Sequence, residues 1–279
     1  MEQLGLDGMP QRLFACTPSK LLTWLDCPRR YRFQYVDRPS PERGPAWAHN
    51  SVGTSVHLAL ARLWDLPVED RTPAAARGLV AQAWRSEGFA DEAQAQRWKG
   101  YAADMVAAYV STLDVSAEPR GVERTVAFTS PGLSVHGRVD RVDERDGSMV
   151  VVDYKTGRSA LSTDDARGSL ALALYVLGSR RTFRRPATRV ELHHLPSGTV
   201  HAWEHTEESL ERHVGRAEAI AAEASAAATV EDYPARPSSL CAWCDFARHC
   251  PEGREASGGP QKPWAGLAQE RSPLEDEVA

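Results

Sequence analysis

Two short stretches decide the fold: Gly137-Arg-Val-Asp140-Arg-Val-Asp143 and Val150-Val-Val-Asp153-Tyr-Lys155-Thr-Gly157. Each pattern predicts a β-strand, the first of which should end at or near Asp140, and turn residues between them predict a hairpin. Residues i and i+2 of a strand face the same side, so Asp153 and Lys155 should project together, and the hairpin should bring Asp140 beside them. Two carboxylates and an ammonium group suit phosphodiester hydrolysis, because carboxylates bind Mg²⁺ or Mn²⁺ and the lysine can orient the attacking water.

The rest of the chain predicts helices before this hairpin, and a helix, two strands and a helix after it. This order indicates an α/β (α+β) fold with a mixed central sheet flanked by helices and a helical N-terminal insertion. We expect one catalytic domain over residues 17–254, with the insertion at residues 50–115. Composition predicts a flexible arm at residues 1–16 and a disordered tail at residues 255–279.

Bulk composition narrows the classes of protein. The 279 residues are 42% hydrophobic and 25% charged, as in a globular protein, and the net charge of −5 means that a nucleic-acid surface must be local. Neither a long apolar run nor a secretory signal is visible, so we expect a cytoplasmic protein with no membrane partner. No phosphate-binding loop is visible, so we expect no nucleotide cofactor, and a helicase partner would act in trans.

The two opening stretches resemble the PD-(D/E)XK nucleases, in particular their RecB-like branch, whose second acidic element commonly has the order D-Y-K-T-G. The resemblance implies a restriction-endonuclease-like core with Asp140, Asp153 and Lys155 as catalytic residues. Upstream, Gly53-Thr-Ser-Val-His57 matches the G-x-x-x-H element of the branch, which implies that His57 is catalytic and binds the metal.

The same resemblance implies further roles. Glu123 stands near the first core strand, where such nucleases often carry an acidic residue, and Tyr175 stands in the helix that commonly carries Q-x-x-x-Y and would be catalytic. The chain departs from this pattern at the glutamine position, which is Ala171. The implied ligands of Mg²⁺ or Mn²⁺ are His57, Asp140, Asp153 and the backbone carbonyl of Tyr154.

The cysteines form a second constellation. The last three, in the spacing C-x2-C-x5-C, are Cys241, Cys244 and Cys250. Clustered cytoplasmic thiols indicate a metal centre, and Cys27 supplies the fourth ligand that such a centre needs. The arrangement resembles AddB-type iron–sulfur nucleases and implies a 4Fe–4S cluster that joins residues 237–251 to Cys27. Zinc on the same four thiolates is the alternative, and Cys16 is expected not to be a ligand.

Two groups of arginines are predicted to contact DNA phosphates, with a solvated charged surface as the alternative. They are Arg29 and Arg30 beside Cys27, and Arg180, Arg181 and Arg184 after Tyr175. Tryptophans are candidates for stacking on bases, with packing in the core as the alternative. They are Trp47, Trp64, Trp84 and Trp98.

The function predicted from these features is a metal-dependent DNA exonuclease or end-processing nuclease in repair or recombination, acting on single-stranded DNA or single-stranded ends. A nuclease of CRISPR adaptation, which shares this core and cluster, is one alternative. A non-catalytic DNA-binding module on the same fold is another, although the intact Asp140, Asp153 and Lys155 argue against it.

Overall fold

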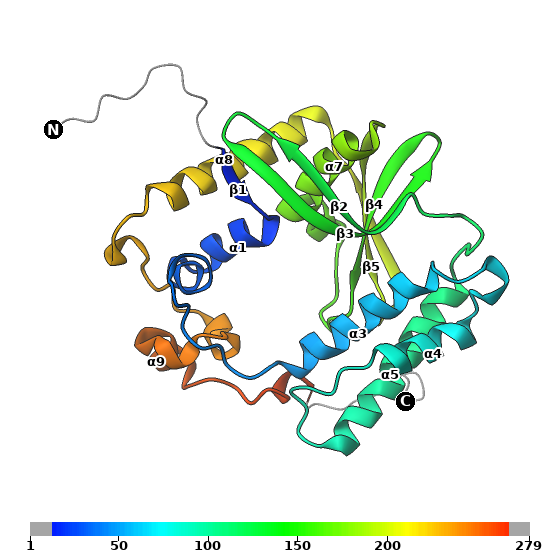
Figure 1. Ribbon diagram of the computed structural model, residues 1–279, viewed down its shortest axis with the longest axis horizontal. Coiled ribbons are helices and arrows are strands. Elements are labelled where there is room, and N and C mark those ends of the chain that lie inside the picture. The colour runs from blue at the N-terminus through cyan, green and yellow to red at the C-terminus, as the bar shows by residue number, and fades with distance from the viewer. Residues whose placement is uncertain (1–12, 268–279) are drawn as a thin grey trace.

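A six-stranded mixed sheet forms the centre of the structure, a computed structural model that describes residues 13–267 (Figure 1). The strand order is β1-β3-β4-β5-β6, and β2 pairs with the remaining edge of β3. Helices flank this sheet, so the predicted fold class is confirmed. The strands are β1 (Phe14–Cys16), β2 (Gly121–Thr129), β3 (Leu133–Arg145), β4 (Ser148–Lys155), β5 (Ala187–His194) and β6 (Thr199–Glu204).

The helices cover both faces of the sheet. Because neighbouring residues of β4 face opposite sides, Val150 and Val152 pack with α3, α4 and α5, whereas Met149 and Val151 pack with α6, α7 and α8. Among the described residues no helix has the length and hydropathy needed to cross a membrane. The α-helices are α1 (Pro18–Asp26), α2 (Pro28–Tyr31), α3 (Ala48–Leu63), α4 (Pro73–Ala83), α5 (Glu92–Ser111), α6 (Thr163–Gly168), α7 (Leu170–Phe183), α8 (Glu207–Ala226) and α9 (Pro251–Ser257). Shorter turns are η1 (Arg32–Val36), η2 (Val68–Asp70), η3 (Val230–Asp232), η4 (Ser239–Trp243), η5 (Ala247–His249) and η6 (Ala265–Leu267).

The strands β3 and β4 diverge at Asp140. Their antiparallel pairing runs from Arg145 opposite Ser148 to Arg141 opposite Val152. Two residues beyond Val152, the backbone N–H of Tyr154 donates to Asp140 Oδ2 at 2.8 Å. A carboxylate therefore takes the place of a ladder carbonyl, and the divergence leaves room for a site between the two strands.

Three local predictions need correction. Asp140 does not end its strand, because β3 continues to Arg145. Residues 14–16, expected in a flexible arm, form β1 parallel to β3, where Cys16 is only 1% exposed. The predicted tail is wrong for residues 255–267, because Leu267 is buried in the core formed by α3, α4 and α5. The other parts of the predicted arm and tail, residues 1–12 and 268–279, lie outside the described residues.

Candidate functional site

Three side chains from three elements converge where β3 and β4 diverge. His57 of α3, Glu123 of β2 and Asp140 of β3 place ligand atoms within 4.8 Å of one another. His57 Nδ1 lies 3.3 Å from Asp140 Oδ1, and Glu123 lies between the paired positions Val122 and Arg124 of β2, whose partners Arg141 and Val139 flank Asp140. We call these three residues, together with Asp153 and Lys155, the Asp140 centre.

Asp153 and Lys155 lie side by side on β4, as their two-residue spacing predicts. Lys155 Nζ lies 2.6 Å from Asp153 Oδ2. Burial raises the pKa of the Asp153 carboxyl, and the charge of Asp140 adds to this effect against the opposing charge of Lys155. The environment of Asp153 thus disfavours the ionised form of its carboxyl. Nearby positive charge would stabilise that ionised form.

The donor set of the centre fits a divalent cation. Burial raises the pKa of Glu123 although Arg138 lies 2.5 Å away. Burial alone would lower the pKa of His57, but its hydrogen bond to Asp140 and the charge of that residue raise it. Carboxylate oxygens are the donors that Mg²⁺ and Mn²⁺ prefer, and the imidazole nitrogen is a softer donor that suits Mn²⁺ better than Mg²⁺. His57, Glu123, Asp140 and Asp153 would hold such an ion.

Two glycines of the quoted motifs make room for the centre. A Cβ atom on Gly137 would lie 2.4 Å from Cε1 of Tyr175, so only glycine lets this tyrosine of α7 pack against β3. A Cβ atom on Gly53 would lie 3.3 Å from Oγ1 of Thr156, so glycine also lets α3 approach the end of β4. Burial, followed by the charges of Asp153 and Asp140, raises the pKa of Tyr175 to about 12. Tyr175 is therefore a neutral phenol beside the centre, and its catalytic role stays a prediction.

A buried polar network, which the sequence analysis missed, fixes the strand that carries Asp153 and Lys155. Arg141 Nη1 donates to the hydroxyls of Tyr154 at 3.0 Å and Tyr109 at 3.2 Å. The guanidinium group also pairs with Asp143, with Nε 2.8 Å from Oδ1. The Tyr109 hydroxyl continues the network to His193 Nδ1 at 2.7 Å. Because Tyr154 stands between the two candidate catalytic residues, its anchored ring holds that part of β4 in place.

Three residues of the Asp140 centre, His57, Glu123 and Asp140, line a groove with a volume of about 1410 Å³. This is larger than the roughly 300–1,000 Å³ of common small-molecule pockets, and suits a polymer. Four exposed arginines that the sequence analysis did not select line the groove and would face the phosphates of a bound strand. They are Arg62, Arg85, Arg138 and Arg158.

None of the five predicted DNA-contacting arginines is among the described residues that line this groove. Arg29 donates to both carboxylate oxygens of Glu252 at 2.7 and 2.8 Å, and Arg30 lines a separate cavity. Arg180 donates to the carbonyl of Ala187 at 2.6 Å and pairs with a glutamate of α8. Arg181 and Arg184 are exposed around the end of α7. Their contacts with DNA stay predictions.

Of the four tryptophans predicted from the sequence, Trp98 alone lines the groove within the described chain. Trp47 is 5% exposed. The guanidinium groups of Arg71 and Arg141 lie 5.1 and 5.7 Å from the ring centre of Trp64. Trp84 packs against Phe89 in the helical core. The structure therefore favours the packing alternative for these three.

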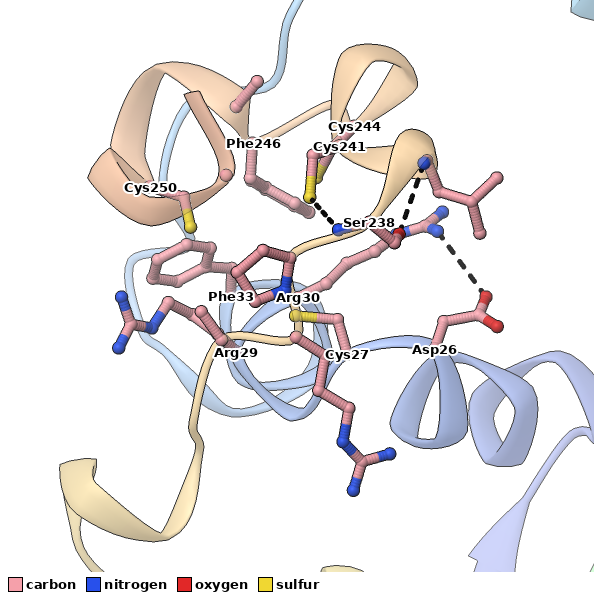
Figure 2. A pocket seen from close by; sticks show the side chains of 16 residues that line it. Asp26, Cys27, Arg29, Arg30, Phe33, Ser238, Cys241, Cys244, Phe246 and Cys250 are labelled. Atoms are coloured by element: carbon pink, nitrogen blue, oxygen red, sulfur yellow. Dashed lines mark hydrogen bonds and ion pairs between the residues drawn. The ribbon is translucent and has the colours of Figure 1, made fainter. Parts of the chain in front are cut away.

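The four predicted cluster ligands line one separate cavity, the cysteine cavity (Figure 2). Cys27 stands between α1 and α2 in extended conformation, and Pro28 begins the second helix, so its thiol faces the other three across the cavity. A Cβ atom on Gly253 would lie 3.3 Å from Cys250 Sγ and 3.4 Å from Cys241 Sγ. The aromatic rings of Phe33 and Phe246 also line the cavity, whereas Cys16 does not.

The spacing of the thiols bears on the occupant of the cysteine cavity. Among the described residues, the only group with three ligand atoms within 4.8 Å of one another is the one formed by His57, Glu123 and Asp140. Zn–S bonds of about 2.3 Å would place the sulfurs of a tetrahedral zinc site about 3.8 Å apart. No three thiols of the described cysteines lie within 4.8 Å of one another, so the four side chains are spaced more widely than in a closed tetrahedral zinc site.

The fold and the Asp140 centre define the class of restriction-endonuclease-like proteins. The sequence model of the PD-(D/E)XK nuclease superfamily matches residues 15–251, and the chain belongs to this superfamily. Nucleases of the superfamily hydrolyse phosphodiester bonds and use divalent metal ions.

The chain was also compared with curated proteins and with solved structures. No curated protein matches the sequence. The solved structure of SSO0001 is similar over 86% of this chain and 87% of its own, with 14% identity and a TM-score of 0.40. A candidate exonuclease from Eubacterium rectale is similar over 100% of this chain and 99% of its own, with 10% identity and a TM-score of 0.44.

A first prediction concerns Glu123, which the sequence placed only near the first core strand. Glu123→Gln should raise the Mg²⁺ concentration for half-maximal cleavage by about 10- to 100-fold, because one charged oxygen donor is lost. The measurements are cleavage rate against Mg²⁺ concentration and Mn²⁺ binding by calorimetry. Glu144→Gln is the matched control, because Glu144 also pairs with an arginine, Arg120 at 3.0 Å, but does not line the groove. An unchanged metal requirement in Glu123→Gln would remove this residue from the metal site.

Proposed function

We propose that the chain is a DNA exonuclease or end-processing nuclease of repair or recombination. It depends on Mg²⁺ or Mn²⁺ and carries a structural 4Fe–4S cluster. The observation that carries the proposal is the Asp140 centre: His57, Glu123 and Asp140 converge at a groove lined by arginines, and the Asp153–Lys155 pair lies on the neighbouring strand β4. A helicase that unwinds duplex DNA in trans would supply the single strand.

The side chains of the Asp140 centre have different roles in the proposed reaction. His57, Glu123, Asp140 and Asp153 hold the metal, which when bound neutralises charge on the phosphate and activates water. The Tyr154 carbonyl is proposed as a further ligand. Lys155 lies 2.6 Å from Asp153 and orients the attacking water while its charge offsets the charge that builds on the phosphate. Tyr175 closes the centre on the side of α7, where it packs against Gly137.

The cysteine cavity supports a structural role for the cluster. It joins Cys27 to a segment more than 200 residues later, and Figure 1 shows α9 beside the N-terminal helices. Arg29 pairs with Glu252 across this junction, and Arg236 donates to the carbonyl of Leu25 at 2.7 Å. No residue of the Asp140 centre lines the cavity, and hydrolysis requires no electrons. The cluster therefore stabilises the fold and stays outside the reaction.

The test of the proposal is digestion of end-labelled single strands by protein that was purified without oxygen. Cleavage should vanish in EDTA and return with Mg²⁺ or Mn²⁺. Ca²⁺ should support DNA binding but little cleavage, because its looser coordination positions the attacking water poorly. Labels at the 5′ and 3′ ends distinguish release of single nucleotides from internal cuts.

Full activity in EDTA would overturn the metal-dependent mechanism. DNA binding without cleavage under any of the three metals would favour the non-catalytic binding module instead.

A further inference from the structure

We propose that the indole of Trp243, with His49 packed edge to face against it, forms a stacking subsite for an unpaired base of the strand that enters the Asp140 centre. We call these two residues the Trp243 platform. The inference rests on the proposed nuclease function and specifies how its single-stranded substrate is recognised: by the face of one unpaired base. A base inside a duplex is already stacked on its neighbours and cannot occupy such a platform.

The platform lies in the groove of the Asp140 centre. Trp243 of η4 and His49 of α3 line the same groove as His57 and Asp140, and both rings are partly exposed. His49 precedes His57 by eight residues of α3, which corresponds to about 12 Å along the helix axis. At about 3.4 Å for each stacked nucleotide, the platform lies three to four nucleotides from the reacting phosphate, and fewer if the strand is stretched.

Buried neighbours hold the indole of Trp243 in place before DNA arrives. The ring centre of Trp243 lies 5.3 Å from that of Trp47 and 5.5 Å from that of His49. Trp47 is itself anchored, because its Nε1 donates to Asp245 Oδ1 at 2.9 Å. A preorganised ring loses little freedom when a base stacks on it, so more of the stacking energy contributes to binding.

The chain around the platform leaves room for both rings. A Cβ atom on Gly266 would lie 3.3 Å from Cη2 of Trp243 and 3.4 Å from Nδ1 of His49, so glycine lets the backbone pass close to both rings. The N–H of Gln261 donates to the carbonyl of Ala242 at 2.9 Å, which ties this passing segment to η4. Burial lowers the pKa of His49, which keeps its imidazole neutral and suited to stacking.

The groove and the cysteine cavity meet at Trp243. This residue stands between Cys241 and Cys244, two of the thiols that line the cavity, while its ring lines the groove. The occupant of the cysteine cavity therefore fixes the turn that presents the indole. Loss of the cluster should weaken binding of single strands through the platform, in addition to its effect on stability.

The test is a scan with abasic sites. Single-stranded oligonucleotides carry one abasic site at each of the first eight positions from either end, and KM and kcat are measured for each. One stacked base contributes about 5- to 150-fold in affinity. For the unchanged protein, KM should rise by a factor in this range at one or two adjacent positions and stay level elsewhere.

Trp243→Ala should raise KM on intact single strands by the same factor, with a smaller effect on kcat. In this variant KM should no longer depend on the position of the abasic site. Trp243→Phe should keep the peak of the scan. His49→Ala serves as a second variant if Trp243→Ala does not fold, and iron content and melting temperature verify that each variant is loaded. Trp203→Ala is the matched control, because Trp203 packs on Arg167 of α6 outside the groove.

A level scan for the unchanged protein, or a peak that survives Trp243→Ala, would overturn the platform. If the protein cuts no DNA at all, the scan is repeated as a binding measurement by fluorescence anisotropy in Ca²⁺. A peak in binding without cleavage then supports the platform and contradicts the proposed nuclease, whereas a level binding scan overturns the platform as well.

Discussion

The Asp153→Asn protein should lose cleavage by on the order of 1,000-fold or more and, in EDTA, melt at a higher temperature than the unchanged protein. The loss of activity follows from the loss of an anionic metal ligand beside Lys155. The gain in stability has a separate cause. Burial raises the pKa of Asp153, so the surroundings of this carboxyl in the folded protein disfavour its ionised form.

The sign of the stability effect can be derived from proton linkage. A carboxyl whose pKa is raised on folding binds more protons in the folded state than in the unfolded state, so its contribution to stability falls as pH rises from the unfolded pKa through the folded pKa. Asparagine is neutral throughout and avoids this loss. For a domain of this size each kcal/mol regained corresponds to about 2–4 °C of melting temperature.

The measurements are single-turnover cleavage and thermal melting with and without Mn²⁺. Mn²⁺ should raise the melting temperature of the unchanged protein and leave that of Asp153→Asn nearly unaltered. Asp146→Asn is the matched control: Asp146 is exposed in the β3–β4 turn with a φ of 51°, a conformation that asparagine also accepts. An Asp153→Asn protein that keeps substantial activity, or that Mn²⁺ stabilises as strongly as the unchanged protein, would remove Asp153 from the metal site.

The central hairpin and its juxtaposed side chains could be predicted because they depend on local periodicity. The two-residue spacing of Asp153 and Lys155 determines that they share a face, and the structure places their charged atoms 2.6 Å apart. The prediction that the strand ends at or near Asp140 was wrong, because the end of a strand depends on its pairing partners. The turn residues Asp146 and Gly147 extend the β3–β4 ladder beyond the motif.

The groove could not be predicted from nearby residues in the sequence. Its arginines come from α3, β3 and two loops, so only the folded chain gathers them. The arginines that cluster in the sequence, such as Arg29 and Arg180, pair with Glu252 and Glu207 instead. Trp243 was not identified from the sequence for the same reason. Its neighbours in sequence are the cysteines, whereas its ring lines the groove with residues of α3.

The short strand β1 illustrates a different limit. Three residues are too few to show an alternating pattern, and Phe14–Cys16 became a strand because β4 leaves one edge of β3 free at Leu133–Val135. This long-range pairing also buries Cys16. Burial raises the pKa of its thiol to about 11, against the charge of Lys20. Cys16 is thus a protonated core residue, and this environment separates it from Cys27.

Cys27→Ala should lose the brown colour and about four irons per chain, and should lower the free energy of unfolding by roughly 5 kcal/mol. The magnitude follows by analogy with a disulfide that closes a loop of more than 200 residues, because the link restricts the unfolded chain far more than the folded one. Ion pairs such as Arg29 with Glu252 hold the same junction, but partly exposed pairs of this kind contribute only about 0–1 kcal/mol each. They cannot replace the cluster.

Cys16→Ala is the matched control, since it removes a buried thiol eleven residues upstream that does not line the cysteine cavity. It should keep its iron and its absorbance near 400 nm, and should cost only about 1 kcal/mol, which is typical of a small change in the core. Iron and zinc analysis, absorbance and urea unfolding of anaerobically purified proteins distinguish the two variants. A Cys27→Ala protein that stays folded at low temperature should still cut DNA, because the Asp140 centre lies outside the cavity. The proposed cluster would be contradicted by a colourless protein that holds one zinc ion, or by a Cys16→Ala variant that loses iron while Cys27→Ala keeps it.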